Sequence, residues 1–316
     1  MDLGGNGAKD KIGILLNITY FSSLGLQNQS YIRSNMSASI PAFQLVEEPR
    51  ILEPILTQRL PVSTNIYNIL KQNKSWKSEH QWFTLQDLTA KDVWVVVTYV
   101  RKDYGQVICI SRPPNAQVTP EIRTAFSNCE FIDWSESFMA ACIETPVSDM
   151  ISSISIRDKG NCTEIHPCYV YSMDPEEALQ LNIPSGNYEI KSIDTEEGIE
   201  FLLKTWKYAM EGSRDYVENC LKRNLSFGVY INNEIVADVI FDCHGLIGML
   251  YSLPEYRGQG LGQLVMRKAM KESAAHQFVP GSTVEKRNIA ARTFMERVGY
   301  KVAAEVDYLF YNKPTY

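Results

Sequence analysis

Short apolar segments between residues 46 and 185 alternate between strand-like and helix-like patterns. Val93–Val100 is dense in β-branched residues, and Gln106–Ile110 follows it across Lys102–Gly105, so the two runs predict a β-hairpin. Thr119 before Pro120 predicts the start of a helix, because threonine caps a first turn in which proline is tolerated. The other elements predicted here are helices over Ile51–Leu60 and Asp174–Leu181 and strands over Cys129–Trp134 and Cys168–Ser172.

The pattern is sharper after the turn residues Pro184–Asn187. Asp194 with Glu197 forms a capping-box pattern and predicts a helix that runs to about Met210, and Ser213 is predicted to cap a second helix over about Arg214–Arg223. Strands are predicted over Tyr188–Ile193, Ser226–Ile231, Glu234–Asp242, Leu246–Leu253 and Ser282–Lys286, with turns at Asn232-Asn233 and His244-Gly245.

These elements divide the chain into three parts. Residues 1–45 are polar, weakly periodic and predict an irregular arm. Residues 46–185 mix strands and helices and predict an N-terminal α/β domain, and residues 186–316 predict a second α/β domain. A length of 316 residues agrees with two domains.

The distribution of charge is more informative than its total. The net charge of −6 argues against nucleic acid as a partner. Residues 250–301 nevertheless contain nine Lys or Arg against four Asp or Glu, a balance of +5 that leaves −11 on the remainder. A basic segment in an acidic chain indicates either a local anionic ligand or ordinary solvated helix faces.

Several classes of protein can be set aside. The longest apolar stretch, Ile12–Leu26, is interrupted by polar residues, so no membrane span is predicted. Seven scattered cysteines without a CxxC predict reduced thiols, and the N-terminus shows no secretory signal, so the expected location is intracellular and cytoplasmic. Cys162, His166 and Cys168 lack a fourth ligand at usable spacing, so no metal site is predicted.

The segment Pro254–Gly262 carries the strongest chemical signal. It is rich in glycine, follows a predicted strand and leads into an amphipathic helix, so backbone N–H groups at the helix start are available for a pyrophosphate. Neither the dinucleotide motif GxGxxG nor the phosphate loop GxxxxGK[ST] matches. The pattern that does match is R-x-x-G-x-G, with Arg257, Gly260 and Gly262.

This loop resembles the cofactor loop of the GNAT superfamily of acyl-CoA-dependent N-acyltransferases. A second signature follows downstream, Asn288-x-x-Ala291-x-x-Phe294, and ends in Val298-Gly299-Tyr300. The resemblance implies a mixed, mostly antiparallel sheet flanked by helices in the C-terminal half, and acetyl-CoA or another acyl-CoA as donor. The residues that it implies for donor binding are Tyr251, Ser252, Leu253, Arg257, Gly258, Gln259, Gly260, Leu261, Gly262, Asn288 and Arg292.

Residues 190–310 are also similar to the glycine N-acyltransferase family. The similarity lies in Leu253-Pro254-Glu255-Tyr256-Arg257 and in Trp206, Ser213 and Cys220. It departs at two positions: Leu246 stands where that family has a glutamate base, and Met295 stands where many superfamily members have a tyrosine acid. The resemblance adds mitochondria as an alternative location. A further hypothesis is that the N-terminal half is a degenerate copy of the same fold without the glycine loop.

The candidates for proton transfer are spread over several elements. His244, Asp242 and Glu285 are the candidate bases, with His244 expected at the surface of a turn and Glu285 at the end of a strand. The candidate acids are Tyr251, Tyr308 and Tyr311.

The function that the resemblance implies is acyl transfer from CoA to a primary amine, either a small molecule or an amino acid. Two alternatives stay open at this point. One is an acyl-CoA-binding regulatory module without turnover, and the other is an acetyltransferase that acts on protein lysines or N-termini.

Overall fold

The computed structural model describes residues 42–76, 79–86, 88, 92–160 and 163–313. All of them belong to one compact unit, Pro41–Tyr316. Most of the predicted irregular arm, and Cys162, lie outside these residues. The last residues of that predicted arm, Phe43–Leu45, form strand β1, which pairs with β2 (Gln81–Leu85).

The N-terminal half confirms the predicted hairpin, since β3 and β4 pair antiparallel. Its further elements are η1 (Pro49–Leu52), α2 (Glu53–Gln58), α3 (Thr64–Trp76), β3 (Trp94–Arg101), β4 (Gly105–Ser111), α4 (Pro120–Ser127), β5 (Phe138–Glu144), α5 (Thr145–Asp158), β6 (Thr163–Ser172) and α6 (Pro175–Leu179). Thr119 caps α4 as predicted. The strand predicted over Cys129–Trp134 is wrong: this segment is a loop whose Phe131 and Ile132 are buried under α4 and α5 by side-chain packing, without strand pairing.

The C-terminal half contains β7 (Glu189–Lys191), α7 (Glu196–Thr205), α8 (Ser213–Arg223), β8 (Ser226–Ile231), β9 (Glu234–Phe241), β10 (Ile247–Ser252), η2 (Pro254–Tyr256), α9 (Leu261–Ala275), β11 (Gly281–Glu285), α10 (Ile289–Val298) and β12 (Lys301–Tyr311). Asn232 and Asn233 have the positive φ angles expected for the β8–β9 turn, 52° and 65°. Two helix limits differ from prediction. Thr195, not Asp194, caps α7, which ends at Thr205, and Gly212 occupies the N-cap position of α8.

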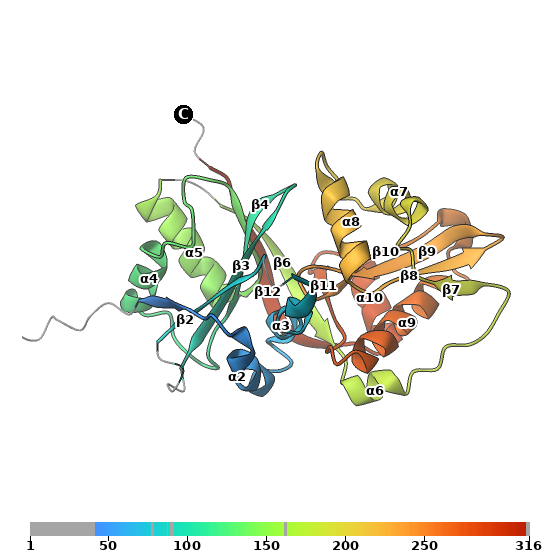
Figure 1. Ribbon diagram of the computed structural model, residues 1–316, viewed down its shortest axis with the longest axis horizontal. Helices are drawn as coiled ribbons and strands as arrows, with labels where there is room; N and C mark the ends of the chain where they lie inside the picture. Colours follow the sequence, from blue (N-terminus) through green and yellow to red (C-terminus); the bar gives the residue numbers. More distant parts are fainter. Residues whose placement is uncertain (1–41, 77–78, 87, 89–91, 161–162, 314–316) are drawn as a thin grey trace, which may run out of the picture. The chain divides into compact units, whose positions relative to one another are not determined.

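The strands form two sheets, and one of them joins both halves (Figure 1). The first has the order β1-β2-β3-β4-β5-β12-β6-β11 and the second β10-β9-β8-β7. Strand β6 of the N-terminal half lies between β12 and β11, and β12 lies between β5 and β6. The two halves therefore exchange their last strands, and the division predicted at residue 186 stays a prediction.

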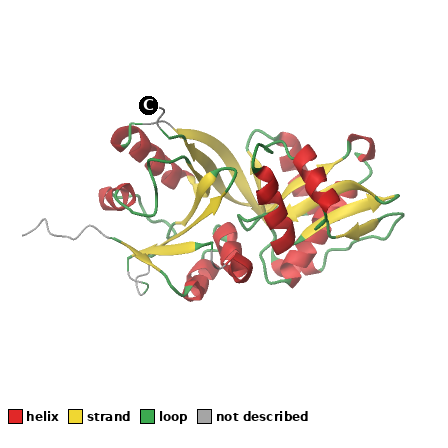
Figure 2. Ribbon diagram, turned by 45° about the horizontal axis from the view of Figure 1, so that its top comes forward, coloured by secondary structure: helices red, strands yellow, loops and turns green. Residues whose placement is uncertain are grey.

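Helices cover both sheets, as Figure 2 shows. One core packs α4 and α5 against β3–β5, and a second packs α9 and α10 against β8 and β9. A third core joins α2, α3 and β3 to α7 and α8, and so spans the two halves. Within the described residues every strand pair is antiparallel except β4–β5, which confirms the predicted mixed, mostly antiparallel α/β class.

Candidate functional site

The glycine-rich loop connects β10 to α9. Gly258 and Gly260 have φ angles of 77° and 82°, which strain any residue with a Cβ, and the space beside each is open. Gly260 is the N-cap of α9, and no side chain caps this helix. The first-turn N–H groups of α9 are therefore not used by a capping side chain, and an anion is the kind of partner that they favour.

The side chains of the loop brace its shape. Arg257 donates from Nε to the carbonyl of Ser252 (3.0 Å), and its guanidinium lies 5.3 Å from the ring centre of Tyr251. Gln259 donates from Nε2 to the carbonyl of Glu255 (3.3 Å). Leu261 is buried in the core under the loop. The predicted donor-binding residues on β10 and in the loop thus form one continuous segment, with Leu261 in the core beneath it.

Helix α10 packs beside this loop. A Cβ at Gly262 would lie 3.2 Å from Ser252 Oγ and 3.7 Å from Phe294, so α9 closely approaches both β10 and α10. Asn288 is the N-cap of α10: its Oδ1 accepts from the N–H of Ala291 at 3.1 Å. Arg292 donates to the carbonyl of Lys286 (3.1 Å). Both predicted residues therefore hold the start of α10 next to the loop.

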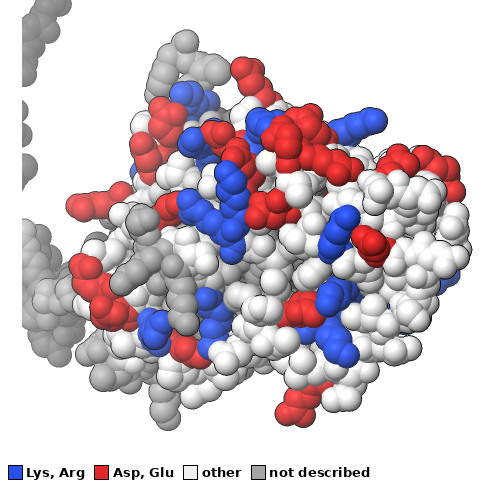
Figure 3. Space-filling model, turned by 45° about the vertical axis from the view of Figure 1, so that its right-hand side comes forward, with Lys and Arg blue, Asp and Glu red and all other residues white. Residues whose placement is uncertain are grey.

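The basic segment 250–301 is partly neutralised by ion pairs. Lys268, Lys286, Arg287 and Lys301 each pair with a glutamate. On the face drawn in Figure 3, Lys and Arg are interspersed with Asp and Glu. The excess of positive charge in this segment therefore does not by itself indicate an anion site. The feature that indicates one is the set of uncapped backbone N–H groups at the start of α9.

Strand β10 is irregular in its middle. Its register against β9 shifts between Gly248 and Tyr251, and Met249 has a φ of 55°. Such a bulge disrupts the ladder locally and re-aims backbone N–H groups. On its other side, β10 contacts β11 but belongs to a different sheet. The strand thus carries the loop at one end and a break in backbone pairing along its length.

Asp242 lies at the other end of β10, where the chain turns from β9. Its Oδ1 accepts from the N–H groups of His244 (2.9 Å) and Leu246 (3.1 Å). Its Oδ2 lies 3.6 Å from where a Cβ of Gly248 would stand, and no other atom outside Gly248 and its two chain neighbours lies within 4 Å of that point. Burial raises the pKa of Asp242 to about 7, although those two N–H groups and the charge of Arg101 oppose the shift. This carboxyl can exchange a proton near neutral pH.

The expectation that His244 lies at the surface is wrong. His244 is buried, 4% exposed, because the turn inserts into the core between the two halves. Its Nδ1 lies 2.5 Å from the hydroxyl of Tyr99, and its Nε2 lies 3.2 Å from Nη1 of Arg101. Burial and the charge of Arg101 lower the pKa of His244 well below its ordinary value.

Glu285 is held by ion pairs at the end of β11. Lys207 (3.1 Å), Arg287 (2.6 Å) and the hydroxyl of Tyr208 all donate to its carboxylate. Partial burial alone would raise the pKa of Glu285, but these hydrogen bonds outweigh it and lower the pKa to about 2. A carboxylate with so low a pKa accepts a proton poorly at neutral pH.

The three candidate tyrosines lie in different places. Tyr251 is half-buried on β10, and Tyr308 on β12 lies beside Thr283 (3.2 Å between the hydroxyl oxygens). Burial raises the pKa of Tyr308 well above its ordinary value. Tyr311 donates to the carbonyl of Trp134 in the N-terminal half. Only Tyr251 stands on the strand that carries the glycine loop.

Asp238 is a further buried carboxyl near the site, and the motifs in the sequence do not single it out. Asp238 is fully buried in the middle of β9, directly opposite Tyr251 in the ladder. Burial raises its pKa well above the ordinary value, against the opposing effect of the Tyr251 N–H. The signal in the sequence was an acidic residue in the middle of the apolar run Ile235–Phe241, where every neighbour predicts a buried strand.

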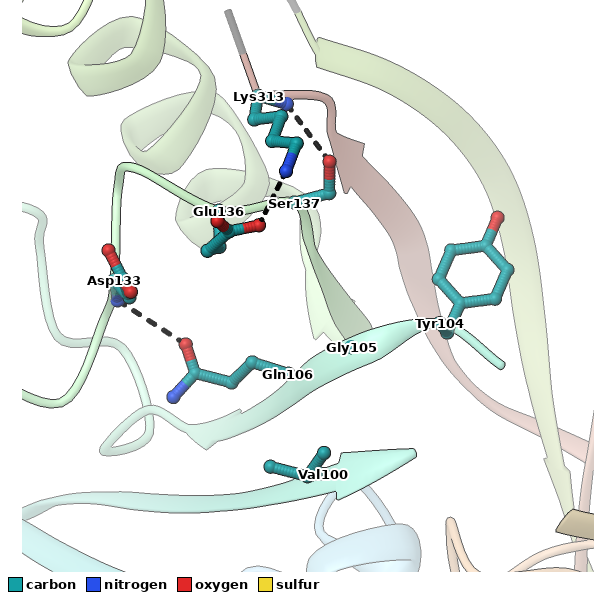
Figure 4. A pocket seen from close by; sticks show the side chains of 8 residues that line it. All are labelled: Val100, Tyr104, Gly105, Gln106, Asp133, Glu136, Ser137 and Lys313. Carbon is teal, nitrogen blue, oxygen red and sulfur yellow. Dashed lines mark hydrogen bonds and ion pairs between the residues drawn. The ribbon is translucent and has the colours of Figure 1, made fainter. Parts of the chain in front are cut away.

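Two cavities of the structure lie away from the glycine loop. One of about 540 Å³ is in the N-terminal half, and Figure 4 shows that Lys313 there is bonded to Glu136 and Ser137. Another of about 720 Å³ lies between α3 and the ends of α8 and α9. Neither is lined by a predicted site residue.

In the described part of the chain, no group of three or more His, Cys, Asp or Glu could hold a metal ion, and no helix is long and apolar enough to cross a membrane.

Comparisons with known proteins locate a family domain on these elements. Residues 223–302 match the sequence model described as an acetyltransferase (GNAT) domain. No curated protein matches the chain. A Drosophila protein of solved structure has a TM-score of 0.75 at 16% identity, over 87% of this chain and 100% of its own. That likeness shows a shared fold.

Two bacterial structures are also similar. A GCN5-related N-acetyltransferase from Sphaerobacter thermophilus has a TM-score of 0.49 at 11% identity, over 88% of this chain and 98% of its own. One from Kribbella flavida has a TM-score of 0.48 at 12% identity, over 78% and 95%. The family model covers β8 to α10, the elements that carry the glycine loop and the β10 bulge. The part of the chain that is similar to a GNAT acetyltransferase domain is thus the part that carries the glycine loop.

Proposed function

We propose that this protein is an N-acyltransferase that moves an acetyl or other acyl group from CoA to a primary amine. The observation that carries the proposal is the uncapped N-terminus of α9 behind Gly258 and Gly260. Its N–H groups would hold the pyrophosphate of the donor. The pantetheine arm would then run along β10, which spans roughly 20 Å, towards Asp242.

We place the reaction at the bulge of β10, where it needs donors for the negative oxygen, a base and an acid. The amine nitrogen bonds to the thioester carbon, and the C–S bond breaks as the thiolate leaves. N–H groups freed by the bulge at Met249 would stabilise the negative oxygen that forms. Asp242 would accept the proton of the amine, because its pKa lies near 7 and its Oδ2 lies beside Gly248, at the edge of the bulge.

Asp242 is a better base than the other candidates. The Nε2 of His244 faces Arg101, and Glu285 is bonded to three donors. Gly281, the first residue of β11, lies against Leu246, so Glu285 at the end of β11 is remote from Asp242. Leu246 is buried, and a base from the adjacent turn would replace the glutamate of the glycine N-acyltransferases. Tyr251 would protonate the leaving thiolate.

A thiol-release assay tests the proposal. Acetyl-CoA and longer acyl-CoA donors are combined with small amines, amino acids and peptides between pH 5 and 9. We expect turnover to rise with pH through about 7, as Asp242 loses its proton. Asp242→Asn should lower kcat by roughly 10²- to 10⁴-fold without changing acyl-CoA affinity. Asp133→Asn, at the cavity of the N-terminal half, is the control.

The same assay separates the alternatives. Tight acyl-CoA binding without thiol release for any amine would identify a regulatory binding module and refute the transferase. Turnover with peptides alone would identify a protein acetyltransferase. Loss of acyl-CoA binding in Asp242→Asn would contradict the assignment of this residue as a base.

A further inference from the structure

Residues of the N-terminal half hold the turn that carries Asp242 through hydrogen bonds and a close backbone contact. From α3, Asn68 donates through Nδ2 to the carbonyls of Gly245 and Val279, both at 2.8 Å. Gln72 donates through Nε2 to the carbonyl of Asp242 at 2.9 Å. A Cβ at Gly245 would lie 2.5 Å from the carbonyl oxygen of Asn65, so the backbones of the two halves meet here. The turn is therefore held by a part of the chain about 180 residues away.

Strand β3 holds the same turn through the ring of His244. Arg101 faces Nε2 at 3.2 Å, and an arginine has only donors to offer. Nε2 must then be the nitrogen that carries a lone pair. It follows that Nδ1 carries the hydrogen and donates to the hydroxyl of Tyr99 at 2.5 Å. The two contacts together specify one neutral tautomer.

Arg101 is itself fixed. It donates twice to Asp103, at 3.0 and 2.7 Å, and Asp103 accepts a third hydrogen bond from Ser213 at 3.1 Å. The guanidinium lies 3.7 Å from the ring centre of Tyr216 on α8. The side chain of Arg101 is 8% exposed and that of Asp103 is fully buried. This buried pair thus presents a rigid donor to His244.

We propose that Arg101 is a positioning residue for the reaction: with Tyr99 it locks His244 in one neutral tautomer, and the locked ring fixes the turn on which Asp242 stands. The inference rests on the proposed function. The N–H of His244 is one of the two donors to Asp242 Oδ1, so a fixed ring fixes the carboxylate as well. The half without a glycine loop thereby supports the half that has one.

The surroundings of Asp242 agree with a neutral ring. The titratable and charged groups that face it are Tyr99 and Arg101 from β3, Cys109 from β4, Cys142 from β5, Tyr216 and Cys220 from α8, Tyr308 from β12, and Cys243 and His244 from the turn. Arg101 is the one cation in this set. A protonated His244 would face that cation directly, which burial makes costly.

Nitrogen-15 NMR of the full chain tests the locked tautomer without any need for activity. The protein has four histidines, and His244→Gln assigns the signal of His244. We expect one neutral tautomer, protonated at Nδ1, from pH 5 to 9. In Arg101→Gln the signal should titrate or average over both tautomers. A wild-type signal that titrates near 6.5, or a spectrum that Arg101→Gln leaves unchanged, would overturn the inference.

Kinetics test the consequence. Glutamine can accept from Arg101 and donate to Tyr99, so His244→Gln should keep kcat within about threefold, whereas His244→Phe should lose at least about tenfold. Arg101→Gln should lower kcat at least about tenfold with an unchanged KM for acyl-CoA, and should move the rise of activity to higher pH, because a cation that lowers the pKa of Asp242 is gone. Arg101→Lys should lower kcat without moving the rise.

The control is Arg112→Gln, which breaks an ion pair with Glu144 in the same half and should leave kinetics unchanged. Loss of all turnover in His244→Gln would make His244 the base and overturn the inference. If the wild type turns over no amine, the proposed function fails, and the NMR result alone decides whether the ring is locked.

Discussion

The two halves of the chain have the same order of helices and strands, but the segment that follows the fourth strand differs between them. In each half a strand is followed by helices, three strands, a helix, a strand, a helix and a last strand. After β4 the N-terminal half has Pro113, Pro114 and a capping Thr119, whose Oγ1 accepts from the N–H of Ile122 (3.4 Å). After β10 the C-terminal half has glycines and no capping side chain. The N-terminus of the helix that follows the fourth strand is thus capped by a side chain in the N-terminal half and uncapped in the C-terminal half.

The neighbouring strands show the same contrast. Strands β4 and β5 pair in parallel over Gln106–Ile108 and Phe138–Ala140, whereas β10 and β11 belong to different sheets. We propose that the N-terminal half is a degenerate copy that has lost the donor site and kept the scaffold. The comparison indicates that an anion site here depends on a few backbone positions, since the remaining elements are present in both halves.

The β3–β4 and β9–β10 hairpins each carry an aspartate, and the two carboxylates differ in their hydrogen-bond partners. Asp103, between β3 and β4, is bonded to Arg101 and Ser213. Asp242, between β9 and β10, accepts two backbone N–H groups on one oxygen only. The carboxylate of Asp103 is thus engaged by side chains, whereas no hydrogen bond to Oδ2 of Asp242 is formed within the described residues, and Asp242 is the residue that we propose as the base.

Replacing each of these aspartates by asparagine should have opposite effects on stability. Asp103→Asn leaves Arg101 buried without its counter-charge and should lower the free energy of unfolding by about 3 kcal/mol. Asp242 has a pKa of about 7 when folded and 3.8 as a reference, so the folded chain holds more protons between these values and its stability falls as the pH rises. Asp242→Asn has no carboxyl to titrate at this position, so it should not lose this stability as the pH rises.

The measurement is denaturant unfolding at pH 5 and pH 8. Relative to the wild type, Asp242→Asn should gain stability at pH 8, by no more than a few kcal/mol, and much less at pH 5. A loss of stability at pH 8 in Asp242→Asn would contradict the prediction that the two aspartates have opposite effects on the free energy of unfolding.

The open loop should be sensitive where an equivalent glycine elsewhere is not. Gly260→Val introduces strain at a φ of 82° and a side chain where the phosphates are proposed to lie, so acyl-CoA affinity should fall at least about tenfold. Gly160→Val is the matched control, with a φ of 69° and open space at the end of α5. Calorimetry that finds equal affinity for both variants would place the donor elsewhere.

The caps of α10 and α5 sharpen the comparison further. Asn288 caps α10 through Oδ1, whereas Glu144, at the N-cap of α5, makes no capping bond. Asn288→Ala should cost about 1 kcal/mol of stability. Asn288→Asp keeps the capping oxygen and loses the Nδ2 donor, so it should retain stability and bind acyl-CoA up to about tenfold more weakly. Thermal melts and calorimetry on both variants separate capping from binding, and unchanged affinity in Asn288→Asp would reduce Asn288 to a cap.

The smallest effect is expected where the halves touch at the surface. Lys102 pairs with Asp215 at 2.7 Å, with side chains that are 72% and 49% exposed. Lys102→Ala should change the free energy of unfolding by less than about 0.5 kcal/mol, because water screens this pair. A larger loss would mean that surface contacts, and not the buried Arg101 pair, hold the halves together.

Local signals in the sequence were enough for most elements of the C-terminal half. Asn232-Asn233, Gly299 and the glycine loop each need a particular backbone conformation, and each has the positive φ angles that those residues favour. The burial of His244 could not be predicted, because its partners Tyr99 and Arg101 lie more than 140 residues away. Cys129–Trp134 has the composition of a strand, yet its apolar side chains are buried by helices instead of by pairing. Contacts of this kind depend on the tertiary fold.

The exchange of last strands has a consequence for synthesis. The ribosome makes the chain from its N-terminus, and β6 emerges long before either of its neighbours, β11 and β12. β5 likewise waits for β12, which ends at Tyr311. Both strands present unpaired edges until β12 has left the exit tunnel. The first half therefore cannot complete its sheet while the second half is still being made.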